Sequence, residues 1–85
     1  MPFTIEFAVS AEREFKALDR STQRRIASRI DALAANPFHS GVKKLQGEPG
    51  LYRTRAGDYR VIFRVDGKRA RVRILKIGHR REVYR

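Results

Sequence analysis

The sequence predicts an α+β domain: an N-terminal strand, two helices and a three-stranded meander, with the helices packed on one face of the sheet. Three observations predict it. Apolar residues alternate in residues 3–7, recur at helical spacing from residue 11 to residue 34, and alternate again in three runs after residue 50. With 85 residues, the chain has room for a single domain, residues 1–85, with a modest two-layer core.

The first strand is predicted from the segment FTIEF. Phe3, Ile5 and Phe7 alternate with Thr4 and Glu6, which is typical of a strand with one buried face. This strand is expected to contribute its phenylalanines and isoleucine to the core.

The first helix is expected to begin with Ser10 as its N-cap. Glu12 and Glu14 would then lie in the first turn, where the helix dipole favours acidic side chains. The apolar stripe of this helix consists of Ala11, Phe15 and Leu18. It is assigned to the core.

The second helix is expected to begin after a break at DRST, with Asp19 or Ser21 as its N-cap. Asn36-Pro37 should end it, because the residue before a proline avoids helical angles. Its apolar face consists of Ile26, Ala27, Ile30, Leu33 and Ala34.

The meander is predicted from the runs LYRTR, YRVIFRV and RARVRILKI. Asp66-Gly67 is a two-residue hairpin signal between the last two runs, and Ala56-Gly57 is a weaker turn between the first two. Counting outward from these turns pairs Arg64 with Arg69, Arg60 with Arg73, and Arg53 with Arg60. Because like charges opposed across strands are destabilising, we interpret this sheet face as a surface for phosphates.

The end of the last strand does not fit this register. Leu75 and Ile77 would lie on the polar face, while Lys76 would point toward the core. A bulge or a covering tail would explain the mismatch, and the sequence leaves both open.

The net charge of +11 is concentrated in the second half of the chain. Residues 1–42 contain six Lys/Arg against five Asp/Glu, whereas residues 43–85 contain fourteen against four. The first half is interpreted as an ordinary solvated surface. The second half predicts an anionic partner, with nucleic acid ahead of an acidic protein or anionic lipid.

Several other chemistries have no signal in the sequence. Cysteine is absent, the two histidines are far apart, and the glycines form no P-loop or dinucleotide motif. We therefore expect no metal and no cofactor. A signal peptide and a transmembrane segment are not found, so we expect a cytoplasmic protein that does not bind membranes.

The segments KKLQG, GLYRTR, GDYRVIFRV and IGHRREVYR, in this order and spacing, resemble the RelE/ParE superfamily of type II toxin–antitoxin toxins. The resemblance covers nearly the whole chain. It implies an N-terminal strand and a two-helix hairpin packed on a mostly antiparallel four-stranded sheet. It also implies an acidic or amphipathic antitoxin partner and growth arrest.

The superfamily combines two activities on one fold. RelE-like members cleave mRNA in the ribosomal A site, while ParE-like members inhibit DNA gyrase without nuclease chemistry. The RelE-like pattern is matched by suitable residues, which favours a metal-independent endoribonuclease that acts on mRNA at the ribosome. The matching positions are Arg53, Arg55, Arg60, Arg80 and Tyr84.

The resemblance implies a role for each of the candidate catalytic residues. Arg60 and Arg80 would hold the scissile phosphate, with Arg55 beside them, and Tyr84 would stack on a base. The chain departs from RelE in having arginines where RelE has lysines on the second strand, and arginine is not a competent base. We therefore expect His79 to transfer protons, with Tyr84 as the alternative.

The other basic residues of the second half are expected to bind RNA. They are Lys43, Lys44, Arg53, Arg64, Arg69, Arg71, Arg73 and Arg81. Two rival functions remain open at this point: a ParE-like gyrase inhibitor, and an RNA-binding module without catalysis.

Overall fold

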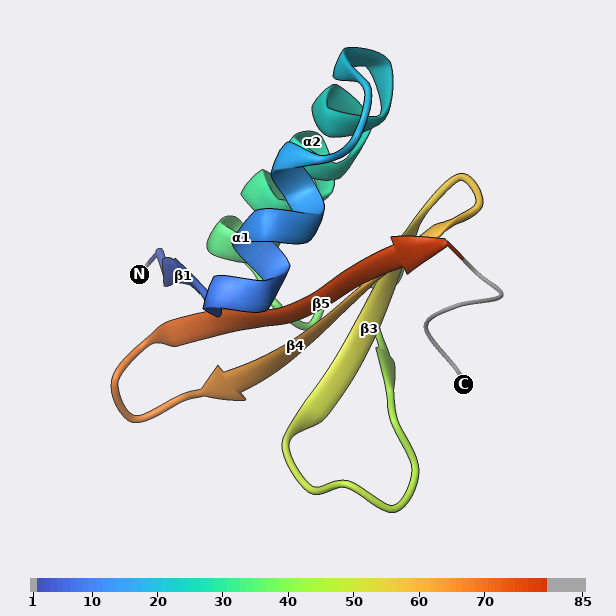
Figure 1. Cartoon of the computed structure of the whole chain (residues 1–85). Coiled ribbons are helices and arrows are strands. Elements are labelled where there is room, and N and C mark those ends of the chain that lie inside the picture. The colour runs from blue at the N-terminus through green and yellow to red at the C-terminus, as the bar shows by residue number, and fades with distance from the viewer. Residues whose placement is uncertain (1, 80–85) are drawn as a thin grey trace.

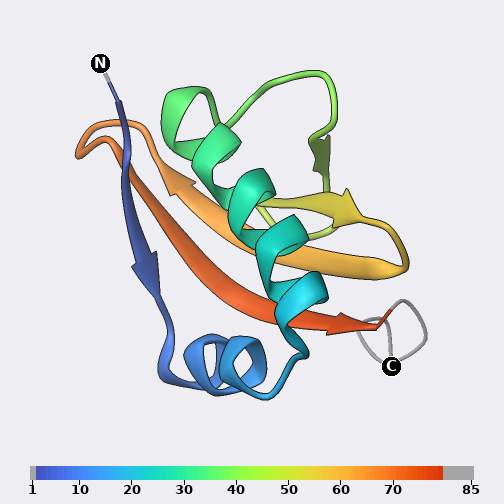
Figure 2. The ribbon, with the colours of Figure 1, turned by 90° about the horizontal axis from the view of Figure 1, so that it is seen from above.

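The computed structural model describes residues 2–79 and shows two helices packed on one face of a five-stranded sheet (Figures 1 and 2). The strand order is β1-β5-β4-β3-β2; β1 is parallel to β5 and the other neighbours are antiparallel. The elements are β1 (Thr4–Phe7), α1 (Val9–Lys16), α2 (Arg20–Ala35), β2 (Lys43–Lys44), β3 (Leu51–Ala56), β4 (Tyr59–Asp66) and β5 (Arg71–His79).

The predicted α+β class is confirmed, and the sheet has one strand more than expected. The additional strand is β2, in which Lys43 pairs with Arg53 and Lys44 pairs with Tyr52. A two-residue strand of two lysines has no alternating pattern, so the sequence gives no periodic signal for it.

The helix starts differ in how well the sequence predicts them. The predicted Ser10 cap of α1 is wrong: the N-cap is Ala8, which makes no side-chain cap bond. The amide of Ala8 donates to the carbonyl of Ile74 at 2.8 Å, so α1 begins directly from the sheet. The predicted Asp19 cap of α2 is confirmed, since its carboxylate accepts from the amide of Thr22 at 3.2 Å and from the Thr22 hydroxyl at 2.6 Å.

The core lies between α2 and the covered face of the sheet. The predicted apolar stripe of α2 is confirmed, because Ile26, Ile30 and Leu33 are all buried. On the sheet side, the buried apolar residues are Ala56, Val61, Phe63, Val72, Ile74 and Ile77. Within residues 2–79, both helices lie on one side of the sheet, and the opposite face has no helix over it (Figure 1).

The predicted two-residue turn between β4 and β5 is wrong. Asp66 pairs with Arg71, so residues 67–70 form a four-residue connection. The carboxylate of Asp66 accepts from the amide of Arg69 at 3.2 Å and supports this longer loop. The loop places Val65 opposite Val72, which pairs two apolar side chains on the core face.

A β-bulge in β5 resolves the mismatch at the end of the last strand. Phe63 pairs with Ile74 but Ile62 pairs with Lys76, so Leu75 is the additional residue. After the bulge the strand faces are exchanged, and Ile77 becomes a core residue with 2% exposure. Of the two explanations that the sequence left open, the bulge is the one observed.

The turn between β3 and β4 is displaced by one residue from its predicted position. Ala56 pairs with Tyr59, so Gly57 and Asp58 form the turn, and Gly57 has a φ of +62°. Glycine adopts this left-handed angle without steric cost. The shift makes Arg55, and not Arg53, the residue opposite Arg60.

Candidate functional site

The uncovered sheet face is rich in arginine and is here called the arginine face. Directly opposed residues of a ladder point to the same side of a sheet, so the pairings assign its members. Its cationic members are Lys43, Arg53, Arg55, Arg60, Arg64, Arg71, Arg73 and, after the bulge, Lys76. The observed strand pairings differ from the predicted ones by an even number of residues as far as the bulge. Because side chains alternate between the two faces, the predicted arginines stay on the same face.

The β3–β4 end of the arginine face brings together Arg55 and Arg60. They are directly opposed, and the residue opposite Arg60 on β5 is Gly78. Arg60 is only 5% exposed, which is unusual for an arginine. Because Gly78 has no side chain, the β5 side of Arg60 is not lined by one at this position. This arrangement concentrates positive charge beside the point where β5 ends.

At the far end of the arginine face, two arginines form ion pairs with carboxylates. The guanidinium of Arg71 lies 3.8 Å from the carboxylate of Glu6 on β1, and that of Arg69 lies 3.9 Å from Asp66. Arg69 belongs to the β4–β5 connection and is not opposed to Arg64 as predicted; the partner of Arg64 is Arg73. The predicted RNA-binding residues are therefore spread along the whole length of β4. Arg69 and Arg71 already lie near carboxylates.

The two lysines and Arg64 border the face on the β2 side. Lys43 and Lys44 are exposed on β2, next to Arg53. A guanidinium nitrogen of Arg64 donates to the carbonyl of Pro49 at 3.2 Å, which ties the β2–β3 loop to the sheet. Arg64 thus has a structural contact in addition to its place on the arginine face.

His79 lies on the other side of the sheet from Arg55 and Arg60. It pairs with Tyr59, whose neighbour Arg60 points to the opposite face. The rings of His79 and Tyr59 are in edge contact, with centroids 5.6 Å apart and planes at 81°. The structure therefore does not place the imidazole on the arginine face, although it places it at the same end of the sheet.

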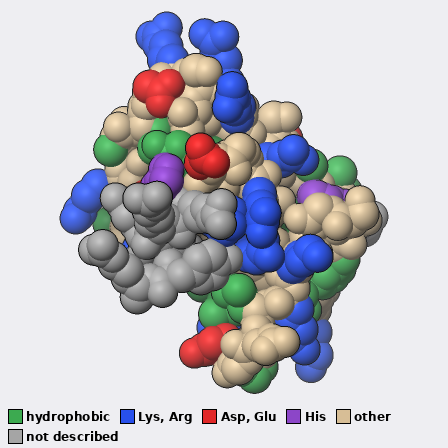
Figure 3. Space-filling model, turned by 90° about the vertical axis from the view of Figure 1, so that its right-hand side faces the viewer, with side chains coloured by type: hydrophobic (Ala, Val, Ile, Leu, Met, Phe, Trp, Pro, Cys, Tyr) green, Lys and Arg blue, Asp and Glu red, His purple; other side chains and the backbone are tan. Residues whose placement is uncertain are grey.

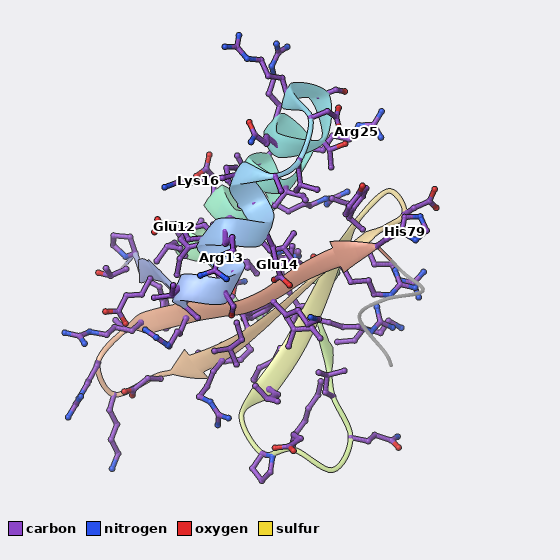
Figure 4. The ribbon with its side chains drawn as sticks, in the orientation of Figure 1. Glu12, Arg13, Glu14, Lys16, Arg25 and His79 are labelled. Atoms are coloured by element: carbon purple, nitrogen blue, oxygen red, sulfur yellow. The ribbon has the colours of Figure 1, made fainter. Side chains whose placement is uncertain are left out.

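Glu14 holds the end of β5 in place, a role that sequence reasoning missed. Among the described residues, β1 pairs with β5 as far as Ile74, and no strand pairs with this edge of β5 beyond that point. The Glu14 carboxylate accepts from the amide of Ile77 at 2.9 Å and from the Lys76 ammonium at 3.3 Å. Figure 4 shows Glu14 pointing from α1 toward β5. The contact spans 63 residues, which no local pattern reports.

Three predicted site residues, Arg80, Arg81 and Tyr84, lie outside the described residues. Figure 3 views the side of the molecule to which the end of β5 points, and Lys and Arg side chains gather in the middle of this view. Within residues 2–79, no group of three or more metal-ligating side chains is found. Neither helix of this part of the chain is long and apolar enough to span a bilayer.

A family model described as ParE toxin of the type II toxin–antitoxin system parDE matches residues 5–84. This match extends over almost the whole domain. The chain belongs to the RelE/ParE superfamily of type II toxins. The predicted family is thereby confirmed.

Individual members of the superfamily are similar to this toxin over their full length. Toxin RelG of Mycobacterium tuberculosis is 29% identical over 86 residues, covering 100% of this chain and 99% of RelG. RelE in the archaeal RelE–RelB complex of Pyrococcus horikoshii is 31% identical, with a TM-score of 0.83 and coverage of 96% and 99%. The isolated RelE toxin of E. coli shares the fold, with a TM-score of 0.82 at 22% identity and coverage of 96% and 90%.

Proposed function

We propose that this toxin is a metal-independent endoribonuclease that cleaves mRNA at the ribosome in the cytoplasm. The single observation that carries the proposal is the buried Arg60, opposed to Arg55 and Gly78 at the end of the arginine face. Two guanidinium groups held opposite each other on a sheet form a fork of N–H donors suited to an anion. An RNA phosphate is such an anion.

The proposed reaction is an internal transfer at one phosphodiester. The ribose 2′-oxygen loses its proton and forms a bond to the adjacent phosphorus. The bond from phosphorus to the 5′-oxygen of the next nucleotide breaks, and that oxygen gains a proton. The products are a 2′,3′-cyclic phosphate and a free 5′-hydroxyl. Such a reaction needs an in-line geometry, stabilisation of the additional charge on the phosphorane, and two proton transfers.

The charge stabilisation is assigned to arginines. The guanidinium of Arg60 donates to the oxygens of the scissile phosphate, Arg55 supports it from β3, and Arg80 completes the set. Burial strengthens this effect, because a charge in a water-poor environment interacts more strongly with a developing negative charge. Tyr84 is assigned to stacking on an unpaired base next to the cleaved bond.

Proton transfer is assigned to His79, since an imidazole can both accept and donate a proton near neutral pH. Its ring is on the helix side of the sheet beside Tyr59, so the assignment requires the ribose to reach the very end of β5. Tyr84 is the alternative acid or base. The two assignments differ in a mutational test that is described in the Discussion.

The relatives support the proposal and the partner that goes with it. The toxin is 29% identical to RelG and 31% identical to the P. horikoshii RelE, and that RelE is seen in a complex with RelB. We therefore propose a cognate antitoxin that is acidic or amphipathic and covers the arginine face. Its binding would exclude RNA by occupying the same cations.

A second candidate function is favoured by the matching family model, which is that of the ParE toxin. In that case the arginine face would bind a protein target and the toxin would inhibit DNA gyrase. An RNA-binding module without catalysis is the third reading of the same face. The three functions differ in what can be measured: the ribonuclease cuts mRNA, the ParE-like toxin inhibits DNA gyrase, and the binding module leaves RNA intact.

The experiment that separates them uses purified toxin with mRNA and ribosomes. Primer extension should map defined cleavage positions, and the new ends should carry a 2′,3′-cyclic phosphate. Because arginines supply the charge stabilisation, cleavage of mRNA should persist after chelation of free divalent ions, provided that the ribosomes remain assembled. Intact mRNA together with inhibited gyrase supercoiling would establish the ParE-like function in its place.

A further inference from the structure

Residues 1–42 have nearly equal numbers of positive and negative side chains, but these charges are unevenly distributed over the surface. Of the five acids in this segment, four already have polar partners. The four contacts are Glu6 with Arg71, Glu12 with Lys16, Glu14 with Lys76, and Asp19 with Thr22. Among the described acids of this segment, Asp31 is the one left to offset the arginines of α2, and the balance in the sequence is therefore not a balance on the surface.

Four of the six cations in this segment lie on the exposed side of α2. Arg20, Arg24, Arg25 and Arg29 are all exposed, and among the described residues none has a carboxylate within 4.0 Å. Arg20 and Arg24 are four residues apart, as are Arg25 and Arg29. Like charges at this spacing destabilise a helix. Folding alone therefore does not account for the arrangement.

Three of these arginines line a hollow between α2 and the β3–β4 turn, here called the α2 hollow. It measures about 570 Å³ and is lined by Arg24, Arg25, Ser28, Arg29, Ala56 and Gly57. A Cβ atom placed on Gly57 would lie 3.4 Å from the Arg25 guanidinium, an ordinary contact distance, so this side chain lies directly beside the turn. The hollow combines guanidinium groups with a serine hydroxyl, which together are donors suited to a phosphate.

The α2 hollow and the candidate site lie on the two sides of one hairpin end. Ala56 and Gly57 directly follow Arg55, which is opposed to Arg60 on the arginine face. Arg25 points toward the side of the molecule at which β5 ends in His79 (Figure 4). A nucleic acid strand that leaves the Arg55–Arg60 pair past the β3–β4 turn therefore meets the α2 arginines next.

We infer that the α2 hollow binds a backbone phosphate of RNA outside the position of cleavage. The inference rests on the proposed ribonuclease function, which it extends by a second contact with RNA. The phosphate can belong to the flank of the cleaved message or to ribosomal RNA, and the chemistry of recognition is the same for both. Arg25 and Arg29 are the principal contacts, because they share the hollow and lie one helical turn apart.

The test is binding of the double variant Arg25→Ala/Arg29→Ala to 2′-O-methyl RNA, which cannot be cleaved by 2′-oxygen attack. The matched control is Arg13→Ala/Lys16→Ala, which removes two cations from α1. Two oligonucleotides are compared: one just long enough for the Arg55–Arg60 end of the sheet, and one three times as long. Affinities are measured by fluorescence anisotropy over a salt titration.

For the longer RNA, the hollow variant should bind about tenfold more weakly, as expected for lost bonds to charged groups. The slope of log affinity against log salt should fall by about 0.7, since each phosphate contact on a single strand contributes about 0.7 and the hollow binds one phosphate. Arg25→Lys/Arg29→Lys should restore most of the slope. The short RNA and the control variant should show little change.

Binding to ribosomes distinguishes the two sources of the phosphate. Reduced affinity for ribosomes with unchanged affinity for both free RNAs assigns the phosphate to ribosomal RNA and supports the inference. Unchanged binding to RNA and ribosomes, or an equal loss in the control variant, overturns it. Weaker binding of the antitoxin alone also overturns it and assigns the hollow to an acidic protein segment. None of these readouts requires cleavage, so a failure of the ribonuclease proposal is seen separately in the wild-type products.

Discussion

Arg55 and Arg60 are directly opposed across β3 and β4, and both point to the uncovered face of the sheet. Pairs of like charge in this position cost stability. Arg60 is nevertheless almost fully buried, so its guanidinium is held in a fixed position and water screens its charge only weakly. The pair is therefore the part of the arginine face that is best suited to stabilise a charge that develops during a reaction.

Replacement of Arg60 by alanine should lower the rate of mRNA cleavage by about 10²–10³-fold, the usual effect of removing one group that stabilises an oxyanion. Arg71→Ala is the matched control, because Arg71 lies on the same face but at the far end, near Glu6. Primer extension measures the rate, and circular dichroism verifies the fold. Equal losses in the two variants would argue that only the overall positive charge matters.

Replacement of His79 by glutamine should reduce cleavage by about 10²–10⁴-fold if the imidazole transfers protons, as the proposal assigns. Tyr59→Phe serves as a control for packing, because it keeps the edge contact with the imidazole ring. A His79→Gln variant with the rate of the wild type would make the histidine structural and leave Tyr84 as the acid or base.

Replacement of Glu14 by alanine should destabilise the toxin and misplace the end of β5. The Ile77 amide would lose its acceptor, and bonds to a charged group contribute about 1.5–3 kcal/mol. Glu14→Gln keeps an oxygen at this position and should recover part of the loss. Urea unfolding measures the stability. The expectation fails if the alanine and glutamine variants are equally stable.

Asp19 should make the stability of α2 depend on pH. Hydrogen bonds from the Thr22 hydroxyl and amide lower the pKa of this carboxyl below its ordinary value of 3.8. A carboxyl whose pKa is lower in the folded state stabilises the fold fully above 3.8, and this contribution is lost as the pH falls through the folded-state value. Asp19→Asn keeps the cap acceptor and should lose this pH dependence in thermal unfolding, whereas Asp19→Ala should be less stable even at neutral pH.

The sequence predicts those features of the fold that repeat along the chain. The stripe of Ile26, Ile30 and Leu33 and the alternation in β4 identify the layers and the buried face. The strand faces also survive the wrong turn predictions, because each turn error shifts the register by an even number of residues. Periodicity identifies faces well, since every residue of an element contributes to it.

The features that the sequence does not predict depend on single contacts. Asp66-Gly67 is a strong hairpin signal, yet the pairing of Val65 with Val72 and the bond from Arg69 to Asp66 favour a longer loop. The acceptor for the Ile77 amide is Glu14, which is distant in the sequence. The candidate site was predicted as a set of arginines, but which of them face each other depends on the exact position of one turn.

The bulge at Leu75 has a consequence for how such toxin genes can change. Every residue after the bulge lies on the face opposite to the one that simple alternation would give it, so Gly78 faces Arg60 while Ile77 is buried. An in-frame loss of the single codon for Leu75 would remove the bulge and leave these faces unchanged, because Ile74 and Lys76 would become consecutive residues that still pair with Phe63 and Ile62. Ile77 would stay on the core face and Gly78 would stay opposite Arg60. Alleles that differ by the presence or absence of this one codon should therefore encode toxins with the same two sheet faces, and the length of this strand is free to vary by one residue at the bulge.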